Sequence, residues 1–523
     1  MSSDLVDMVS LTFHALGSDK SAFWVIFAGA LAVVFVVSRF RSNKKFPPGP
    51  IAWPIIGCLP SVGFQYRHKT FFNLSKKYGP IMYIQLGGAD MILIHSPELA
   101  VEALKIQDAQ FCSRPLTTPG KYIAFDYSDI DFSPYNANWR LVRKVFNTEL
   151  MSTSRLNMQA KMRKEEVMGM AARVLDYTTK GQLVKLKKVA DDVVLNILLQ
   201  MLFGKRYENS ESNVAKELKN FEPYVREAVI LVGELNIGDL IPFLARFDLQ
   251  GFEARYKKLM DKVGRLFQII IDEHKKTLEQ IGEMMSEESK DVLDVLLFQK
   301  GENKLTTNQI MGVMTDMLLG GLDTTARAIE WAMAELIASP HTLRKAQQEI
   351  DNVVGTERLM EESDIDKLPY LQAVVKETLR LHPPVPITNP HLNEAPATLA
   401  GYNLPANCMV FVNIWGLGRD PSMWKNPSEF DPDRFIGTEL NVHGNHYQFL
   451  PFSSGRRKCP AYHMATLKVQ YALGMLLQCF NWAPPAGISG KDMDLSEGVG
   501  IVCGKKDPLF ATATPRVDSC LYI

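Results

Sequence analysis

One long helical segment limits the folds open to this chain. Thr306 and Gln309 carry the sequence signature of a capping box, in which each side chain satisfies a backbone N–H of the other. Helix-forming residues then continue to Ser339, and Pro340 ends them. About 33 residues at ~1.5 Å each give a helix of roughly 50 Å. Such a helix is long enough to cross a whole domain.

The composition favours one large unit. The chain has 523 residues, 46% of them hydrophobic, and no Ser/Gly-rich or charged linker interrupts its middle. Its 58 basic and 58 acidic residues balance, so net charge gives no reason to expect nucleic-acid binding. The seven cysteines are scattered and odd in number, which fits a reducing compartment better than a disulfide framework.

The middle of the long helix reads Gly320-Gly321-Leu322-Asp323-Thr324-Thr325. Two adjacent glycines cost on the order of 1 kcal/mol each relative to alanine, so we expect either a close approach by another element or a deformed helix. Asp323 and Thr324 follow at once, which puts an acid and a hydroxyl beside a local gap. Taken alone, such a pattern is more often a tolerated glycine pair followed by residues that bond to the local backbone.

The second notable segment is the basic loop Phe452–Ala461, which reads Phe-Ser-Ser-Gly-Arg-Arg-Lys-Cys-Pro-Ala. Pro460 suits the first position of a helix, which puts Cys459 at or next to the N-cap. The helix dipole and the three basic residues before the cysteine favour a thiolate. That thiolate could be a nucleophile, a redox thiol or a metal ligand, but no second cysteine lies within three residues to form a redox pair or a zinc site. A single thiolate on a loop also suits a haem iron that is to cleave oxygen.

The loop resembles the haem-ligand loop of the cytochrome P-450 superfamily. Phe452, Gly455, Arg457 and Cys459 stand at the fixed positions of its motif F-x-x-G-x-R-x-C. The superfamily usually has glycine two residues after the cysteine, where this chain has Ala461. The resemblance implies haem b as the cofactor, with the Cys459 thiolate as iron ligand and with Phe452 and Arg457 as haem-binding residues.

The glycine pair in the long helix matches the superfamily pattern A/G-G-x-D/E-T. By this resemblance, the hydroxyl of Thr324 steadies bound oxygen and Asp323 feeds a proton relay. Cleavage of the O–O bond needs two protons at the distal oxygen, which is why an acid and a hydroxyl are needed here. Asp323 and Thr324 are therefore the expected catalytic residues.

Four further residues are candidates for binding the haem propionates. Trp139 and Arg143 lie four apart on a predicted helix and share one face, where a ring N–H and a guanidinium can clamp a carboxylate. Without other evidence, such a pair is more often structural. In the superfamily this W-x-x-x-R pair holds a propionate, and the resemblance suggests the same role for Arg114 and His391. A plain strand histidine remains an equal alternative for His391.

Glu377 and Arg380 stand three apart on a helix that Pro383 and Pro384 end. On a surface such a pair contributes only ~0.2–0.5 kcal/mol. In the superfamily this E-x-x-R pair is structural and is joined by the arginine of a later loop, here Arg434. A buried acid with two bases is stable only if every partner is present.

Residues 1–45 are predicted to anchor the chain in a membrane. Ala22–Val37 is an unbroken apolar run of 16 residues, near the lower limit for a spanning helix. Acidic residues precede it and four basic residues lie between 39 and 45, which disfavours a cleaved signal peptide and places the rest of the chain in the cytosol. The proline-rich stretch Phe46–Pro50 then forms a stiff hinge, as in microsomal superfamily members.

Other segments give coarser expectations. Ile81–Leu86 and Met91–Ile94 read as a β-hairpin, followed by a helix from Pro97. Residues 158–300 are mostly amphipathic helix with polar breaks. Val385–His391 should form a strand beneath the haem edge, in which Val385–Asn389 faces the substrate.

The motifs follow the superfamily's order over about residues 46–516. The resemblance implies a mainly α fold with a small β-region, in which one catalytic domain (46–523) follows a single transmembrane helix at the endoplasmic reticulum. It implies a monooxygenase that draws NADPH electrons through a membrane-bound reductase docking on the Cys459 side, with Arg456 and Lys458 as contacts; cytochrome b5 is a further possible donor. No flavin or nicotinamide motif is present in the chain itself.

Two other functions stay open. The first is a relative with the same fold that rearranges a hydroperoxide without a reductase, although such relatives usually lack the threonine that Thr324 provides. The second is a non-enzymatic haem carrier or membrane scaffold, which would not need a helix interrupted beside an acid and a hydroxyl.

The substrate is less defined. The segments expected to line its site are mostly apolar, with a few hydroxyls and amides: 122–127, 221–237, 314–319, 385–389 and 499–502. They suit a small lipophilic, aromatic metabolite of the phenylpropanoid type. N-hydroxylation of an amino acid is the alternative.

Overall fold

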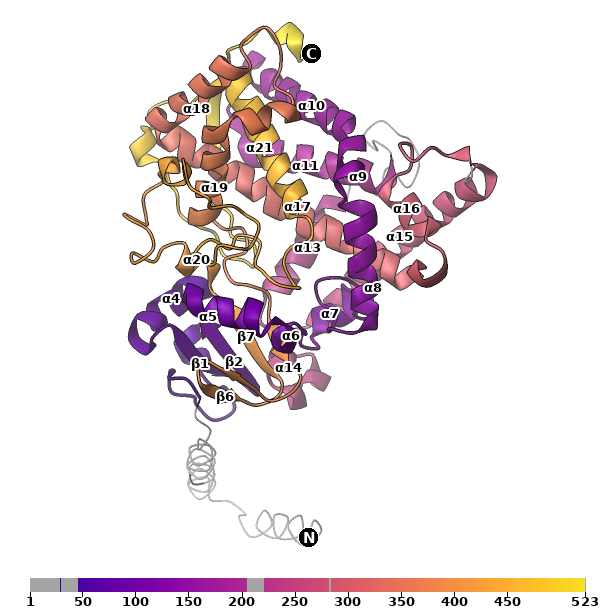
Figure 1. The fold of residues 1–523 in the computed structure, drawn as a ribbon, viewed down its shortest axis with the longest axis vertical. Coiled ribbons are helices and arrows are strands. Elements are labelled where there is room, and N and C mark those ends of the chain that lie inside the picture. Colours follow the sequence, from indigo (N-terminus) through magenta and orange to yellow (C-terminus); the bar gives the residue numbers. More distant parts are fainter. Residues whose placement is uncertain (1–28, 30–45, 205–220, 282–283, 523) are drawn as a thin grey trace, which may run out of the picture.

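The structure, a computed structural model, describes residues 29, 46–204, 221–281 and 284–522 (Figure 1). The apolar run Ala22–Val37, expected to cross the membrane, lies outside these residues except for Gly29. Among the helices that the structure does describe, none combines the length and the apolar character that a membrane span requires. The boundary at residue 46 therefore stays a prediction.

Helices make up most of the described chain. They are α3 Leu59–Val62, α4 Arg67–Tyr78, α5 Pro97–Val101, α6 Asp108–Phe111, α7 Thr118–Tyr122, α8 Ala137–Val145, α9 Thr153–Met158, α10 Ala160–Thr179, α11 Leu186–Phe203, α13 Phe221–Gly233, α14 Ile237–Leu240, α15 Phe252–Ile281, α16 Val292–Phe298, α17 Thr307–Ala338, α18 Pro340–Val353, α19 Pro369–Leu381, α20 Ile414–Leu417 and α21 Tyr462–Cys479. The amphipathic helices expected over 158–300 are confirmed.

The long helix α17 runs through the helical part of the molecule. The predicted capping box is present: Thr306 Oγ1 accepts from the Gln309 N–H and Gln309 Oε1 accepts from the Thr306 N–H. The helix ends at Ala338, and Pro340 then opens α18. Most of its side chains are buried against α11, α19 and α21, so it forms the centre of the hydrophobic core.

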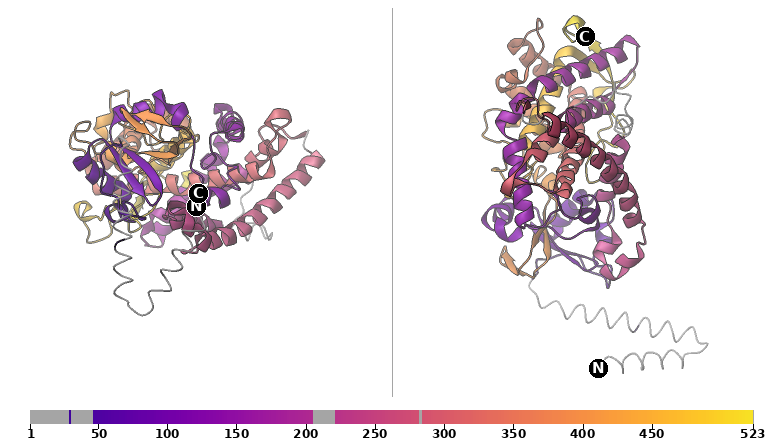
Figure 2. Two further views of the ribbon diagram at one scale, coloured as in Figure 1. Left: turned by 90° about the horizontal axis from the view of Figure 1, so that it is seen from below. Right: turned by 90° about the vertical axis from the view of Figure 1, so that its right-hand side faces the viewer.

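The strands are short and gather mainly at one end of the molecule (Figures 1 and 2). They are β1 Ile81–Leu86, β2 Ala89–Ile94, β3 Val184–Lys185, β4 His391–Asn393, β5 Ala397–Leu399, β6 Tyr402–Leu404, β7 Cys408–Val412, β8 Phe480–Ala483 and β9 Phe510–Pro515. The largest sheet has the order β1-β2-β7-β4. The predicted hairpin is confirmed, with Tyr83 opposite Ile92.

Of the strand predicted over Val385–His391, only His391 lies in a strand. Strand β4 begins only at His391, where that residue pairs with Val410. Prolines at 383, 384, 386 and 390 lack the N–H that a strand ladder requires. The segment is held by isolated bonds instead: the Thr388 N–H donates to the Val412 carbonyl, and the Val412 N–H donates to Thr388 Oγ1.

The predicted ion network is present and buried. Arg380 Nε and Nη2 lie 2.6 and 2.7 Å from the two carboxylate oxygens of Glu377. Arg434 Nε donates to the same carboxylate at 3.2 Å. Arg380 also donates to three backbone carbonyls of the segment 418–429. The network thus fastens α19 to the chain that leads to the Cys459 loop.

Candidate active site

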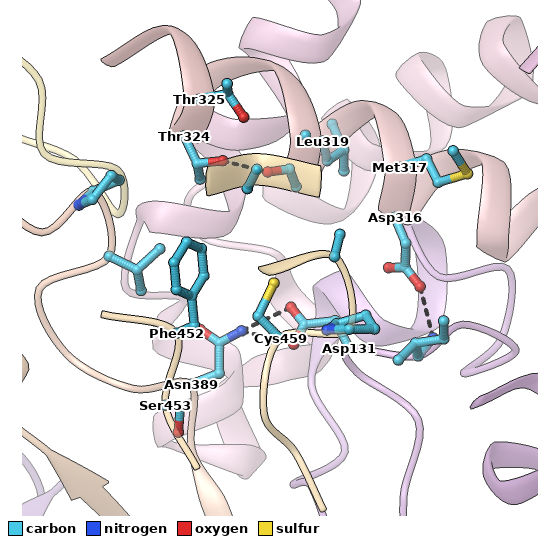
Figure 3. Close-up of a pocket in the computed structure, with 18 of the residues that line it drawn as sticks. Asp131, Asp316, Met317, Leu319, Thr324, Thr325, Asn389, Phe452, Ser453 and Cys459 are labelled. Carbon is cyan, nitrogen blue, oxygen red and sulfur yellow. Dashed lines mark hydrogen bonds between the residues drawn. The ribbon is translucent and has the colours of Figure 1, made fainter. Parts of the chain in front are cut away.

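A cavity of about 340 Å³ lies between α17 and the loop that carries Cys459 (Figure 3). Gly320, Gly321 and Thr324 of α17 line it on one side, and Phe452 and Cys459 line it on the other. Most of the other lining side chains are apolar. The two segments that the sequence singled out are therefore brought face to face, although more than 100 residues separate them.

The start of α21 corrects one prediction. The helix begins at Tyr462, with Ala461 as its N-cap, so Pro460 lies in a turn before the helix and Cys459 is two residues before the N-cap. The Cys459 N–H donates to the Phe452 carbonyl at 3.0 Å, which closes the loop on itself. Gly455 has φ +72°, and a Cβ there would lie 2.4 Å from the Leu104 carbonyl oxygen, so the loop requires glycine.

The electrostatics of Cys459 differ in part from expectation. Burial raises the pKa of its thiol, against the opposing effects of the Ala461 N–H, Arg143 and Lys458. Arg456, expected to favour the thiolate, donates instead to Asp108 at 2.6 Å. The Nζ of Lys458 donates to the His443 carbonyl. A positively charged partner such as a metal ion would favour the buried thiolate further.

The two glycines let the helix pass close to its neighbours without a break. α17 is continuous through them, so the helix is not deformed there. A Cβ at Gly321 would lie 3.0 Å from Leu198 of α11, whereas one at Gly320 would meet nothing within 4 Å. Thr324 Oγ1 donates to the Gly320 carbonyl at 2.5 Å (Figure 3). Gly320 thus leaves open space on the cavity wall beside the Thr324 hydroxyl.

The structure separates Asp323 from Thr324. Asp323 is not one of the described residues that line the cavity, and its carboxylate lies 3.3 Å from Nε of Arg327. A relay through Asp323 would need its side chain to leave Arg327. Its assignment stays a prediction.

Basic side chains gather on one edge of the cavity, which Arg114, Arg143, Arg457 and His391 line. Arg143 donates to the Lys458 carbonyl, and Arg457 donates to three carbonyls, of Cys112, Ile130 and Ser133. Among the described residues, neither guanidinium has a carboxylate within ion-pair distance.

These charges fit the haem that the sequence implies. Buried guanidinium groups are stable only when anions compensate them, and the two propionates of haem b would supply that charge. Burial, with the like charge of Arg114, lowers the pKa of Arg457 to about 9, so an added anion would stabilise its charged form. His391 is held neutral, since burial and the neighbouring Arg114 and Arg457 put its pKa well below the ordinary value. The donor set therefore fits a dianionic group beside a thiolate.

Trp139 does not reach the cavity wall. Its Nε1–H donates to the Ile130 carbonyl at 2.9 Å, and the Arg457 guanidinium lies over its ring at 4.3 Å. Arg143 lies farther from the same ring, at 6.0 Å. In this arrangement Trp139 supports Arg457, and the propionate clamp of Trp139 and Arg143 stays a prediction.

Sequence reasoning did not single out an acidic pair beside the cavity, of which Asp316 lines it. Asp316 of α17 accepts from the Ile130 N–H at 2.7 Å (Figure 3). Its side chain is hydrogen-bonded to Asp129, which caps the Phe132 and Ser133 N–H groups. Burial and the charge of Asp129 raise the pKa of Asp316 well above its ordinary value, and burial raises that of Asp129 to about 7. The pair therefore holds a shared proton that ties loop 126–136 to α17.

The Asp316→Asn variant is expected to gain stability relative to the wild type as pH rises. A carboxyl whose folded pKa is raised binds more protons in the folded state, so its contribution to stability falls above its unfolded pKa near 4. Asparagine keeps an acceptor for the Ile130 N–H and a donor for Asp129 without that proton. The gain at pH 8 over pH 5 is expected to be on the order of 1 kcal/mol. Urea unfolding of both proteins at pH 5 and pH 8 measures this gain. If the variant and the wild type differed in unfolding free energy by the same amount at both pH values, the shared proton would be contradicted.

The segments predicted to surround the substrate all contribute to the cavity, though unevenly. From them come Ile123, Val229, Val232, Thr315, Asp316, Met317, Leu319, Val385, Thr388, Asn389, Ile501 and Val502. The segment 122–127 supplies only Ile123, because Phe125, Asp126 and Tyr127 take up positive φ in a tight turn.

Comparison with known proteins identifies relatives over nearly the whole chain. Residues 47–510 match the family model described as Cytochrome P450. A flavonoid 3',5'-hydroxylase of Crocosmia x crocosmiiflora is 36% identical over 501 residues, which cover 92% of this chain and 93% of that protein. A flavonoid 3'-monooxygenase of Arabidopsis thaliana is 35% identical over 502 residues, covering 94% and 95%.

Solved structures share the architecture. A zebra fish cytochrome P450 determined with progesterone superposes with a TM-score of 0.73 at 25% identity, covering 86% of this chain and 99% of that chain. A second zebra fish cytochrome P450 structure, determined with abiraterone, superposes with a TM-score of 0.70 at 26% identity. The likeness includes both the helical part and the small β-region, so the predicted fold class is confirmed for the described residues.

Proposed function

This chain belongs to the cytochrome P450 family and is a haem-thiolate monooxygenase of the plant type, and we propose that it oxidises a small, lipophilic, aromatic metabolite of the phenylpropanoid or flavonoid type. The observation that carries this proposal is the cavity, whose walls are mostly apolar between Cys459 and Thr324. Such walls bind a flat aromatic molecule by burial of its surface. The similarity to flavonoid hydroxylases supports the same substrate class.

The haem would supply the oxidising chemistry, inserting one atom of O2 into the substrate while the other leaves as water. Cys459 would hold the iron from the loop side. Arg143 and Arg457 would hold the propionates, because their guanidinium groups line the cavity without carboxylate partners among the described residues. His391 would join them only as an imidazolium, because the proton of the neutral ring lies on Nδ1, which donates to the Phe111 carbonyl. Phe452 would pack against the group from the loop, where it lines the cavity beside Cys459.

Thr324 is assigned the handling of protons. Its hydroxyl donates to the Gly320 carbonyl, so its oxygen is free to accept from a group that enters the space beside Gly320. Asp323 would supply protons to it from the Arg327 side of the helix.

Electrons would come from NADPH through a membrane-bound reductase that docks on the Cys459 side. Arg456 remains partly exposed there although it pairs with Asp108, and it is the better candidate for contact with an acidic partner. Lys458 is partly buried and bonded to His443. Cytochrome b5 is a further donor for the same face.

We place the protein at the endoplasmic reticulum membrane, held by Ala22–Val37. Large apolar side chains are exposed on two segments, 51–64 and 243–249. Both meet at the β1–β2 hairpin, since the Gly87 N–H donates to the Ile56 carbonyl and the Gly88 N–H donates to the Leu240 carbonyl. This apolar surface lies where the chain enters the domain, which suits contact with a lipid bilayer.

Reconstitution in membranes with a plant NADPH-dependent reductase tests this function. Oxidised product from flavanone or a simpler phenylpropanoid, dependent on NADPH and reductase, would support it. Turnover of a hydroperoxide without reductase would favour the rearranging rival. Product only from amino acids would favour N-hydroxylation, and haem binding without any turnover would favour a carrier.

The Thr324→Val variant is expected to form product roughly 100-fold more slowly or worse, in the range that positioned proton-transfer groups contribute. Valine keeps the volume but removes the hydroxyl. Oxygen consumption should fall less than product formation, and the oxygen that does not enter product should appear as hydrogen peroxide. The matched control is Thr325→Val, because the neighbouring Oγ1 is buried without a hydrogen-bond partner. Product per NADPH measures the effect, and equal coupling in the two variants would remove Thr324 from the mechanism.

A further inference from the structure

The apolar cavity has one wall of acceptor groups that the haem chemistry does not use. Asp131 lies in loop 126–136, which contacts the middle of α17, and Asn389 comes from the proline-rich segment before β4; both line the cavity. The Nδ2 of Asn389 lies 2.8 Å from both carboxylate oxygens of Asp131 (Figure 3). The chain thus brings together two polar side chains that are 258 residues apart.

The carboxylate of Asp131 is open to the cavity. Its side chain is 41% accessible, whereas that of the neighbouring Arg114 is only 6% accessible. Arg114 Nη2 lies 3.6 Å from Asp131 Oδ1, a long ion pair that leaves room for a second donor. A carboxylate has about four acceptor positions, so Asn389 and Arg114 do not exhaust it.

Asp131 and Asn389 present hydrogen-bond acceptors to the cavity and few donors. Asn389 directs its N–H groups to Asp131, and its Oδ1 accepts no hydrogen bond from the residues that the structure describes. Both carboxylate oxygens of Asp131 and the amide oxygen of Asn389 are therefore acceptors at the cavity wall. A ligand group that fits them must donate a hydrogen bond.

The surrounding charge selects the kind of donor. The guanidinium of Arg114 lies 3.6 Å from Asp131 and already offsets part of its charge, whereas Arg143 and Arg457 are assigned to the propionates. A cationic amine beside Asp131 would experience the like charge of Arg114, whereas a neutral hydroxyl would gain a charge-assisted hydrogen bond without that repulsion.

We propose that Asp131 and Asn389 form a recognition site for a neutral hydroxyl of the substrate, so that the enzyme selects phenols over their ethers. This proposal rests on the function proposed above and narrows its substrate class to aromatic compounds that already carry a free hydroxyl. Asp131 accepts from the hydroxyl, and Asn389 fixes the orientation of the carboxylate.

Three flavanones test the site: 4′-hydroxyflavanone, its 4′-methoxy ether and unsubstituted flavanone. Their dissociation constants from the holoenzyme are measured from the change in haem absorption on binding. Wild type is expected to bind the phenol about 10- to 100-fold more tightly than the other two, as for a hydrogen bond to a charged group. In Asp131→Val the preference should fall to about 1- to 2-fold, since only the acceptors are lost.

The variants carry their own controls. Asp131→Val leaves Arg114 with its bonds to the carbonyls of residues 131, 389 and 390 but without a carboxylate partner in the described chain, so the ratio of haem to protein is measured beside the preference, and Asn389→Leu tests the site with Asp131 in place. Asn389→Leu is a second variant and should weaken the preference, because the carboxylate loses the amide that orients it. Thr315→Val removes another cavity hydroxyl, one without a hydrogen-bond partner, and should leave the preference at its wild-type value.

A second scaffold separates this proposal from the flavonoid assignment. 4-Phenylphenol and 4-methoxybiphenyl carry the same contrast without a flavonoid ring system. Preference for the phenol on this scaffold, with no flavanone bound, would support the hydroxyl site and overturn the flavonoid assignment. The hydroxyl site would be overturned if wild type bound phenol and ether equally, or bound neither scaffold. It would also be overturned if the preference for the phenol survived in Asp131→Val or was lost in Thr315→Val.

Discussion

Replacing Glu377 by glutamine is expected to lower the free energy of unfolding by about 3–5 kcal/mol, the usual cost of removing one partner from a buried ion pair. Glu377 is fully buried and carries the only carboxylate that Arg380 contacts in the described chain. In the variant, Arg380 and Arg434 would keep only carbonyl acceptors for their charges. A typical domain has 5–15 kcal/mol of stability in all, so much of the protein should fail to fold.

The effect should also reach the haem loop. Arg380 and Arg434 hold the backbone of segment 418–429, which leads into the loop of Cys459. Urea unfolding of the purified protein measures the stability, and the ratio of haem to protein measures the site. In Glu377→Gln we expect both the free energy of unfolding and the haem-to-protein ratio to fall.

The matched control is Asp176→Asn, which breaks the i,i+4 pair with Lys180. Both side chains of that pair are more than half exposed, and surface pairs contribute about 0–1 kcal/mol. Asp176→Asn makes the same acid-to-amide change, but it leaves no buried charge without a partner. If Glu377→Gln cost no more than Asp176→Asn, the network would not be a structural centre of the fold.

The sequence anticipated elements whose signals are local. The ends of α17 follow from a capping box at Thr306 and a proline at 340, and the β1–β2 hairpin follows from strand-forming runs on either side of two glycines. The motif around Cys459 likewise lies within ten residues. Each of these is determined mostly by neighbours along the chain.

What the sequence missed depends on contacts between distant segments. Asp316 and Asn389 lie in segments predicted to line the cavity, but nothing local marks their pairing with Asp129 and Asp131, because these contacts form only when α17, loop 126–136 and the proline-rich segment meet. The sequence signal that could have singled out Asp316 is its position on α17. It lies four residues before Gly320 and eight before Thr324, on the same face of the helix.

One local rule failed for a physical reason. Pro460 was placed at the start of a helix by preference alone, but the bond from Cys459 to Phe452 keeps the chain in a turn until Ala461. The role of Asp323 stays a prediction: neighbouring residues on a helix point about 100° apart, and the Asp323 carboxylate lies beside Arg327.

Replacing Cys459 by serine should abolish thiolate ligation of the haem altogether. Serine keeps the size of the side chain, and the turn made by the Cys459 N–H and the Phe452 carbonyl does not depend on sulfur. A serine hydroxyl stays protonated near neutral pH and is a poor substitute for a soft thiolate ligand. Oxygen activation, which depends on electron donation from the thiolate, should fall to the uncatalysed level.

The matched control is Cys112→Ser. Cys112 is buried near the same basic edge, where its carbonyl accepts from Arg457, but it does not line the cavity. Its carbonyl remains in the variant, so the haem spectrum should keep its wild-type form.

The most direct test is the carbon monoxide difference spectrum of the reduced, membrane-bound protein. We predict a Soret band red-shifted to the thiolate position in wild type and Cys112→Ser, and its absence in Cys459→Ser. A red-shifted band that persists in Cys459→Ser, or a wild type without one, would contradict the assignment of Cys459 as the iron ligand and with it the account of the active site.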